Sequence, residues 1–218
     1  MKKLAFIVFL ALIGKVVFAQ TSVVFPYSSM IEKGDFVEAE KKIMEIYSKD
    51  STDAINCYAA YSLYASEKNP NRNLEKAHSY ILRCADIYNS LDAKGKAKCE
   101  KKNLNNKSLQ SAVSAIEFRM AKNVNTVEAY QQFIDNQPVS KETDEAKQLR
   151  NALAYRQTVA ENTIEAYERF INAYPSAKEA DAALFNVHNI AYRNAEAINT
   201  EQSYRDYIKK YPFSPFAE

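Results

Sequence analysis

Glycine is nearly absent from this sequence. Of 218 residues only three are glycine, and only Gly34 and Gly95 lie beyond the first twenty positions. Phosphate-binding loops and the tight turns of most α/β enzymes use glycine, because it adopts a positive φ without strain. The shortage therefore argues against that class of enzyme. Combined with abundant Ala, Glu, Lys and Gln, it predicts an all-α chain.

The residues that carry most catalytic and metal chemistry are also few. Histidine occurs only as His78 and His188, and no Cys-x-x-Cys, His-x-x-x-His or phosphate-binding glycine motif occurs. Carboxylates are plentiful, but Glu128, Glu165 and others fall at expected helix starts or on polar faces. No local spacing predicts a catalytic carboxylate pair. We therefore expect a non-enzymatic protein without a cofactor or a metal site.

Cysteine occurs three times, as Cys57, Cys84 and Cys99, an odd number for an exported protein. One interpretation is that all three are small buried hydrophobic residues. The other is a disulfide between Cys57 and Cys84. These two lie 13 and 14 residues on either side of Pro70, so an antiparallel hairpin that turns there would bring them level.

A long hydrophobic run occurs only at the start of the chain. Lys2-Lys3 precedes the apolar run 4–14, and Val17-Phe18-Ala19 follows, with small residues at the positions that a signal peptidase reads. This order predicts a secretory signal peptide over residues 1–19 and a protein exported to the periplasm or cell envelope. The alternative is a membrane anchor, but Lys15 leaves the run shorter than the ~20 apolar residues of a span. We expect no transmembrane span after cleavage.

Excess charge of either sign is missing as well. The sequence has 29 Lys and Arg against 27 Asp and Glu, and residues 1–19 contain three of the lysines and no acid. The mature chain would therefore have 26 basic and 27 acidic residues, a net charge of −1. Binding to nucleic acid needs a basic footprint, so nucleic acid is not an expected partner.

What the sequence does contain is a repeat. Residues 126–138 return as 163–175 and again as 200–212, a period of 37 residues without insertion or deletion. In each copy a short amphipathic pattern ends at proline and a longer helical pattern follows. A fixed period of this length predicts a stack of antiparallel helical hairpins.

Each copy begins with Asn-Thr, as in Asn125-Thr126. Either residue is an expected helix cap, and Glu128 is placed to complete a capping box with the asparagine. Tyrosine recurs in register four residues after the threonine, at Tyr130, Tyr167 and Tyr204. Packing between repeats explains this recurrence. The alternative is an exposed tyrosine ladder on the concave face of a carbohydrate or small-molecule receptor.

Positions that vary between the copies are better candidates for recognition than positions that recur. We assign protein or peptide binding to six polar residues of the long helices: Arg150, Arg156, Gln157, Asn186, His188 and Arg193. Arg156 and Arg193 do recur, so pairing with neighbouring acids is an alternative role for these two.

Three regions follow the signal peptide. Residues 20–91 are expected to form hairpins of lower regularity, and residues 108–218 hold the 37-residue repeats. Between them, residues 92–107 are rich in lysine and weakly periodic, which predicts an irregular segment. It is either a solvated loop or a basic docking patch for an acidic partner or a membrane surface.

Two stretches resemble a known family. Gly34-Asp35-Phe36 followed by Ala39 is similar to the turn and second helix of a tetratricopeptide (TPR) repeat. Residues 166–184, with Tyr-Pro-Ser-Ala and alanines three residues apart, look like the repeats of bacterial envelope proteins, namely the outer-membrane assembly lipoprotein and the Tol-Pal-associated periplasmic protein. The resemblance covers residues 27–91 and 120–218. The period exceeds the usual 34, and the common tryptophan and Leu-Gly are missing.

The resemblance implies a right-handed α-solenoid that serves as a scaffold for protein–protein or peptide binding in the envelope. The start of the chain and the Phe18-Ala19-Gln20 junction are similar to exported proteins of the Bacteroidota. Residues 213–218 occupy the place where the period expects another long helix. We therefore also consider that this sequence is the repeat region of a longer protein whose activity lies after residue 218.

Overall fold

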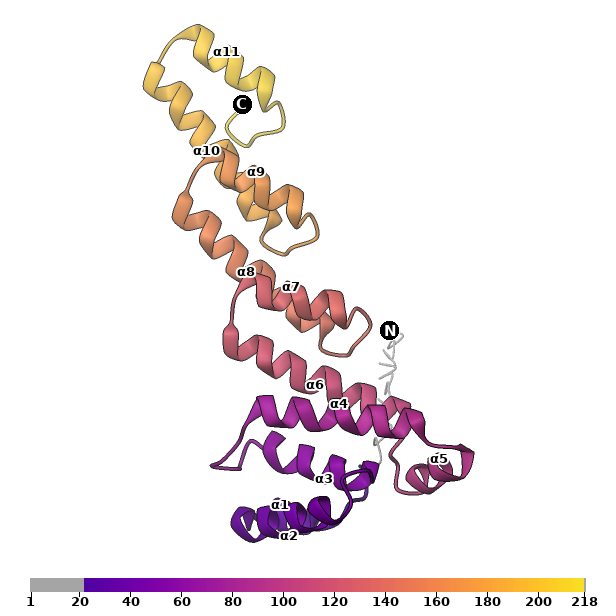
Figure 1. Cartoon of the computed structure of the whole chain (residues 1–218). Helices are drawn as coiled ribbons and strands as arrows, with labels where there is room; N and C mark the ends of the chain where they lie inside the picture. The colour runs from indigo at the N-terminus through magenta and orange to yellow at the C-terminus, as the bar shows by residue number, and fades with distance from the viewer. Residues whose placement is uncertain (1–21, 218) are drawn as a thin grey trace, which may run out of the picture.

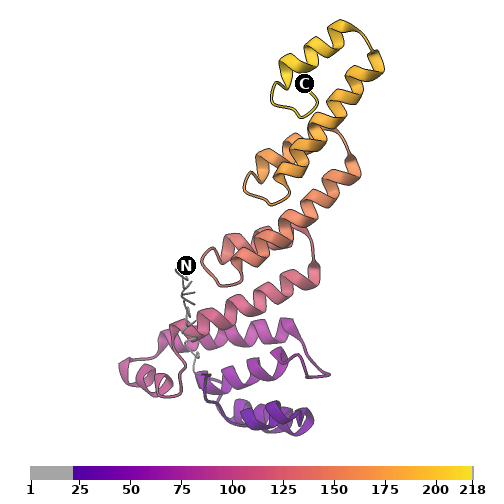
Figure 2. The same cartoon turned by 180° about the vertical axis from the view of Figure 1, so that it is seen from behind.

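The structure is a computed structural model that describes residues 22–217. The expected signal peptide, residues 1–19, lies outside these residues. Within them the chain is all-helical and has no strand, as the composition predicts. Figures 1 and 2 show an elongated molecule, with a stacked block at the N-terminal end and a zigzag of helices that leads away from it, an arrangement consistent with an α-solenoid. The helices are α1 (Ser28–Lys33), α2 (Phe36–Lys49), α3 (Ala54–Ala65), α4 (Leu74–Ser90), α5 (Ala93–Glu100), α6 (Asn106–Val124), α7 (Val127–Asn136), α8 (Thr143–Glu161), α9 (Ile164–Ala173), α10 (Ala180–Ile198) and α11 (Glu201–Lys210).

The N-terminal block has one continuous hydrophobic core. It extends from Val23 to Ile116 and joins α2, α3, α4 and the first half of α6. Ile43, Leu63 and Ile81 are completely buried at its centre. Because α6 belongs to this core and also begins the zigzag, the two parts of the molecule share a helix.

Residues 92–107 are more ordered than the sequence pattern predicts. Asp92 accepts the backbone N–H of Gly95 at 2.7 Å and starts α5, and Asn105 caps α6 in the same way. Between the two helices Leu104 is completely buried in the N-terminal core. Residues 93–100 are therefore helical where an irregular segment is expected, because side-chain caps and the buried Cys99 and Leu104 hold a short helix where hydrophobic periodicity is weak.

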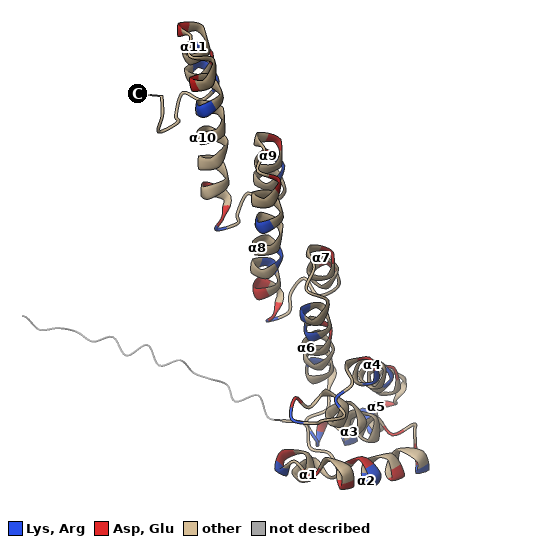
Figure 3. Ribbon diagram, turned by 90° about the vertical axis from the view of Figure 1, so that its left-hand side faces the viewer, with Lys and Arg blue, Asp and Glu red and all other residues tan. Residues whose placement is uncertain are grey.

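Helices of 19 and 10 residues alternate from α6 to α11. We call α6–α7, α8–α9 and α10–α11 the first, second and third units; equivalent positions differ by 37 in residue number. Figure 3 shows that each unit is displaced from the one before it, so the three form a staircase. α8 supplies its N-terminal half to one small core through Ala146 and its C-terminal half to the next through Ala154.

Of the two expected helix caps, threonine is the one used. The hydroxyls of Thr126, Thr163 and Thr200 accept a backbone N–H of the next turn at 3.1–3.2 Å. Asparagine instead ends the preceding long helix in the left-handed conformation, with φ of 54°, 49° and 52° at Asn125, Asn162 and Asn199. The expected capping box between asparagine and Glu128 is thus replaced by two separate caps, one on each side of the junction.

The three cysteines of the described chain are buried free thiols. Although α3 and α4 pack together, the Cys84 thiol donates to the carbonyl of Ala54 at 3.1 Å and the Cys57 thiol to that of Ser51 at 3.8 Å. The structure therefore does not form the Cys57–Cys84 disulfide, because each thiol is directed at a different carbonyl. The other interpretation, that all three cysteines are small buried residues, agrees with the structure.

No helix among residues 22–217 has the length and apolar character needed to span a membrane.

Candidate functional site

The recurring tyrosines belong to the packing of the array. Tyr130 and Tyr167 are each 2% exposed. Their hydroxyls donate to the side-chain oxygens of Asn125 and Asn162 at 3.2 Å, and Tyr204 repeats this bond with Asn199. The tyrosine therefore holds the side chain of the residue that ends the preceding long helix in the left-handed conformation. An exposed ladder, the basis of the expected receptor for carbohydrates or small molecules, is not formed.

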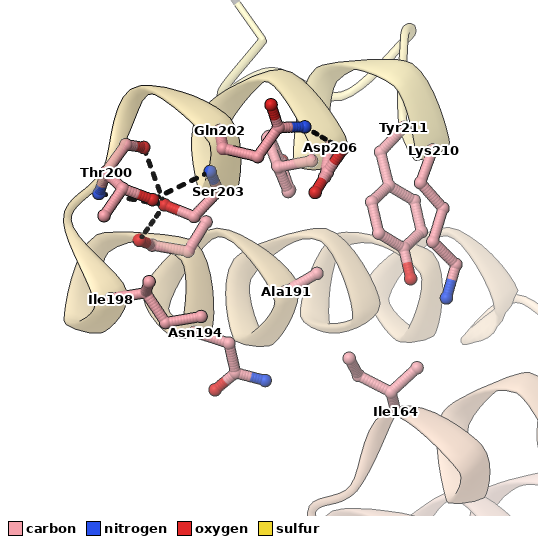
Figure 4. A pocket seen from close by; sticks show the side chains of 12 residues that line it. Ile164, Ala191, Asn194, Ile198, Thr200, Gln202, Ser203, Asp206, Lys210 and Tyr211 are labelled. Atoms are coloured by element: carbon pink, nitrogen blue, oxygen red, sulfur yellow. Dashed lines mark hydrogen bonds between the residues drawn. The ribbon is translucent and has the colours of Figure 1, made fainter.

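A groove of about 430 Å³ lies between α10 and α11 of the third unit. Figure 4 shows Asn194 and Ile198 projecting from α10 along one wall and Gln202 and Asp206 on α11 along the other, with Ile164 of α9 at the far end. Gln202 donates to Asp206 at 2.8 Å. This groove thus combines an aliphatic floor with amide and carboxylate groups on its rim.

The end of this groove at the junction of the two helices is fixed by hydrogen bonds. The hydroxyl of Ser203 donates to the carbonyl of Ala195 at 2.9 Å, which ties α11 to α10. Ser203 and Thr200 also form a reciprocal capping box. A side-chain hydroxyl of α11 and a backbone carbonyl of α10 therefore hold the two walls together at this end.

The first unit has a groove at the equivalent place. It measures about 240 Å³ and is lined by Met120, Val124 and Gln132, which are two periods before Asn194, Ile198 and Asp206. His78 of α4 contributes to its wall and lies 3.1 Å from the carboxylate of Glu117. The two grooves are therefore the same structural feature in the first and third units.

The second unit has charged residues of opposite sign at two positions that line the groove in the other units. Glu161 is equivalent to Val124 and Ile198, and Arg169 is equivalent to Gln132 and Asp206. The two side chains form an ion pair of 2.6 Å that bridges the walls from α8 to α9. The guanidinium beside Glu161 lowers the pKa of that carboxyl. An ion pair thus takes the place of the aliphatic floor in the middle of the array.

Exposure supports the distinction between the units. Val124 is 63% exposed and Ile198 is 66% exposed, high values for branched aliphatic side chains at equivalent sites. Single exposed hydrophobic residues are common on protein surfaces and do not by themselves indicate a binding site. Here, however, each lies in a groove, and the unit between them has a charged residue in the same position.

The predicted recognition residues are not brought together into one site. Gln157 is equivalent to Met120 and Asn194, so it occupies the groove position of the bridged unit. Arg156 and Arg193 are exposed. Their equivalent in the first unit, Arg119, is committed to the N-terminal block, where it donates to the carbonyl of Ala65 and to Glu67, both at 2.8 Å.

Arg150 lines a different cleft, of about 640 Å³, between α8 and the loop that follows α9. Its guanidinium lies 4.7 Å from the centre of the Tyr174 ring and donates to Gln131 at 2.5 Å. These contacts are within the protein and hold α8 against its neighbours. Arg150 therefore acts first as a packing residue.

Asn186 and His188 also make internal contacts. The amide of Asn186 donates to the Tyr155 hydroxyl at 3.3 Å, and the His188 ring packs edge-on against Tyr211 at 5.5 Å. Burial lowers the pKa of His188. Sequence reasoning gave weight to polar residues of the long helices and so missed the groove residues Met120, Val124, Asn194, Ile198 and Asp206. The alternation of aliphatic and charged residues at 124, 161 and 198 was the signal that could have found them.

Within residues 22–217 no group of three or more His, Cys, Asp or Glu side chains is placed to hold a metal ion. The groove residues are aliphatic side chains, amides, hydroxyls and isolated charges. This arrangement can bind a ligand by apolar contact and hydrogen bonding. Neither a family model nor a curated protein matches this chain.

Proposed function

We propose that this protein is an exported, non-enzymatic TPR-like scaffold that binds a protein or peptide segment along α6–α11 in the bacterial envelope. In this proposal the three units form a right-handed solenoid of antiparallel hairpins with a period of 37 residues. Export rests on the sequence of residues 1–19, and a mature N-terminus at Gln20 in exported protein would test it.

The observation that carries the proposal is the recurrence of one groove in the first and third units. Groove residues are separated by two full periods, as Met120 and Asn194 are. A partner that presents two apolar side chains at a matching separation would contact both at once. Binding at two linked sites strengthens attachment beyond either site alone, because the second contact is intramolecular.

The chemistry of the grooves suits a polypeptide. Val124 and Ile198 offer aliphatic surface to an apolar side chain, while Gln132, Asn194 and Gln202 offer amide groups to a peptide backbone. Apolar contact and amide hydrogen bonds would dominate such an interaction, although Glu117 and Asp206 add charge to the grooves, so we expect binding that depends weakly on salt.

Site-specific photocrosslinking in the native cells tests this proposal. A photoreactive amino acid is placed singly at Met120, at Asn194 and at Gln157, the equivalent position of the bridged unit. We expect the same crosslinked protein from positions 120 and 194 and none from position 157. Crosslinking of equal yield from all three positions, or of unrelated proteins from 120 and 194, would contradict the shared groove.

A further inference from the structure

The lysines of residues 92–107 form a surface that the proposed scaffold function does not use. This segment has six lysines and two acidic residues, a net charge of +4. Because the mature chain would carry −1, the remainder carries −5. Positive charge is therefore concentrated in one short part of an otherwise acidic molecule.

α5 and its C-cap residue place three of these lysines on one outer face. Lys94, Lys98 and Lys101 follow one another at intervals of four and three residues, which aligns them on one side of a helix. All three are exposed. The opposite face holds the helix to the block through Cys99, which is buried, and Glu100, which accepts the Tyr88 hydroxyl at 3.1 Å.

These lysines are not used in ion pairs. None of the ion pairs among residues 22–217 includes a lysine of residues 92–107. Lys98 shares a pocket of about 190 Å³ with Asp50 and Asp53, which offset part of its charge. Lys94 and Lys101 do not line that pocket, and both are exposed and outside the ion pairs of the described residues, so their charge is available to a ligand.

The chain enters the described fold at this patch. The amide of Val24 donates to the carbonyl of Lys102 at 2.9 Å, and Asn103 donates to the carbonyl of Ser22 at 3.0 Å. In the sequence, the apolar run 4–14 ends eight residues before Ser22. The described chain therefore begins beside the lysine-rich segment.

We propose that the outer face of α5 is a docking surface for the anionic headgroups of a phospholipid membrane. Anionic membranes attract clusters of lysine through a diffuse field and need no fixed bonding geometry. The segment 92–107 contains no arginine, the residue that suits bidentate recognition of carboxylates on a protein partner. Lysine alone therefore favours a lipid surface over an acidic protein.

This placement also orients the scaffold. α5 lies in the N-terminal block, whereas α11, which lines the groove of the third unit, lies at the far end of the staircase (Figure 1). A molecule that rests on a membrane through α5 would thus extend its later units away from the surface, where a second protein could reach them.

Vesicle flotation with the chain 20–218 tests the proposal. The probes are vesicles of neutral phosphatidylcholine and vesicles that also contain 30% phosphatidylglycerol. We expect binding to the anionic vesicles only, with loss at 0.5 M salt because exposed charges are then screened. Each lysine contributes about fivefold to such binding, so the variant K94Q/K98Q/K101Q should bind about 100-fold more weakly.

The matched control is K33Q/K68Q/K209Q, which removes the same charge from exposed lysines elsewhere that form no ion pair. Circular dichroism confirms that both variants remain helical. Soluble glycerol phosphate should not compete, because the surface rather than a single phosphate is recognised. Equal loss in the two variants, equal binding to neutral vesicles, or capture of an acidic protein by these lysines without lipid binding would overturn the proposal.

Discussion

Glu161 and Arg169 form an ion pair of 2.6 Å across the second unit, at the positions where Val124 and Gln132 leave a groove in the first. The pair joins α8 to α9 by side chains, in addition to the packing that all three units share. The same backbone therefore presents an open groove or a bridged one according to two residues. These two residues can therefore change the recognition surface of a unit while its fold stays the same.

The ion pair should matter little for stability. Its side chains are 50% and 63% exposed, and exposed pairs contribute less than ~1 kcal/mol because water screens them. We expect Glu161→Val, which copies the first unit, to change the free energy of unfolding by less than about 1 kcal/mol. Urea denaturation measures this, and a loss several times larger would mean that the pair is a structural element of the array.

The junction between the long and short helices should be much more sensitive. Asn162 has a φ of 49° and accepts the Tyr167 hydroxyl. Glycine tolerates this conformation, whereas alanine adds a strain of about 1–2 kcal/mol. Loss of the hydrogen bond adds about 1 kcal/mol in either variant.

We therefore expect Asn162→Ala to destabilise the protein by about 2–3 kcal/mol, and Asn162→Gly and Tyr167→Phe by about 1 kcal/mol each. The pair Asn162→Gly with Tyr167→Phe should cost less than the sum of the two, because both remove one bond. Thermal unfolding provides the values. An alanine variant as stable as the glycine variant would show that the left-handed backbone is not strained.

His188 should make stability depend on pH below neutrality. Burial lowers its pKa in the folded protein, so the unfolded chain binds the proton more readily. Stability is then present above the ordinary histidine pKa of about 6.5 and declines as the pH falls through it. We expect His188→Asn, which copies Asn151 of the second unit, to reduce this decline between pH 7 and 5. A variant with the full slope of the parent protein would contradict the assignment.

The buried thiols should make the stability of the protein depend on pH in the alkaline range. Burial raises the pKa of Cys57 to about 11 and raises that of Cys84 as well, while an unfolded thiol titrates near 8.5. The folded state retains the proton longer, so stability is complete below about pH 8.5 and is lost as the pH rises toward 11. Each thiol should contribute a slope of about −1.4 kcal/mol per pH unit in this window.

Cys57→Ala should reduce that slope, even though loss of the buried side chain makes the variant less stable near neutral pH. Thiol titration gives an independent check on the same residues. All three cysteines should react with a thiol reagent in denaturant without prior reduction, and none should react rapidly in the native protein. Only one reactive thiol in denatured, unreduced protein would restore the disulfide interpretation.

Sequence periodicity was sufficient to predict the helices but not to predict the grooves on their surface. The return of residues 126–138 at 163–175 predicts alternating short and long helices, because caps and proline stops are local features. It predicts packing of Tyr130 for the same reason. The assignment of Asn125 failed because a residue between two helices can cap either one, and only the backbone angle distinguishes them.

The groove escaped prediction because it depends on two positions in different helices. Val124 and Gln132 are unremarkable one by one, and their relation to Glu161 and Arg169 appears only when the helices are placed side by side. The order of segment 92–107 escaped because only two buried residues, Cys99 and Leu104, anchor it. Neither feature produces a periodic signal of its own.

The most direct test of the central claim is to exchange the two arrangements. Ile198→Glu with Asp206→Arg should introduce the bridging pair into the third unit, and Glu161→Ile with Arg169→Asp should open the second. With photoreactive residues at positions 194 and 157, we expect the first exchange to abolish crosslinking at 194 and the second to create it at 157, with the fold unchanged by circular dichroism. If crosslinking persists at 194 after the first exchange and remains absent at 157 after the second, the claim that these grooves bind the partner is contradicted.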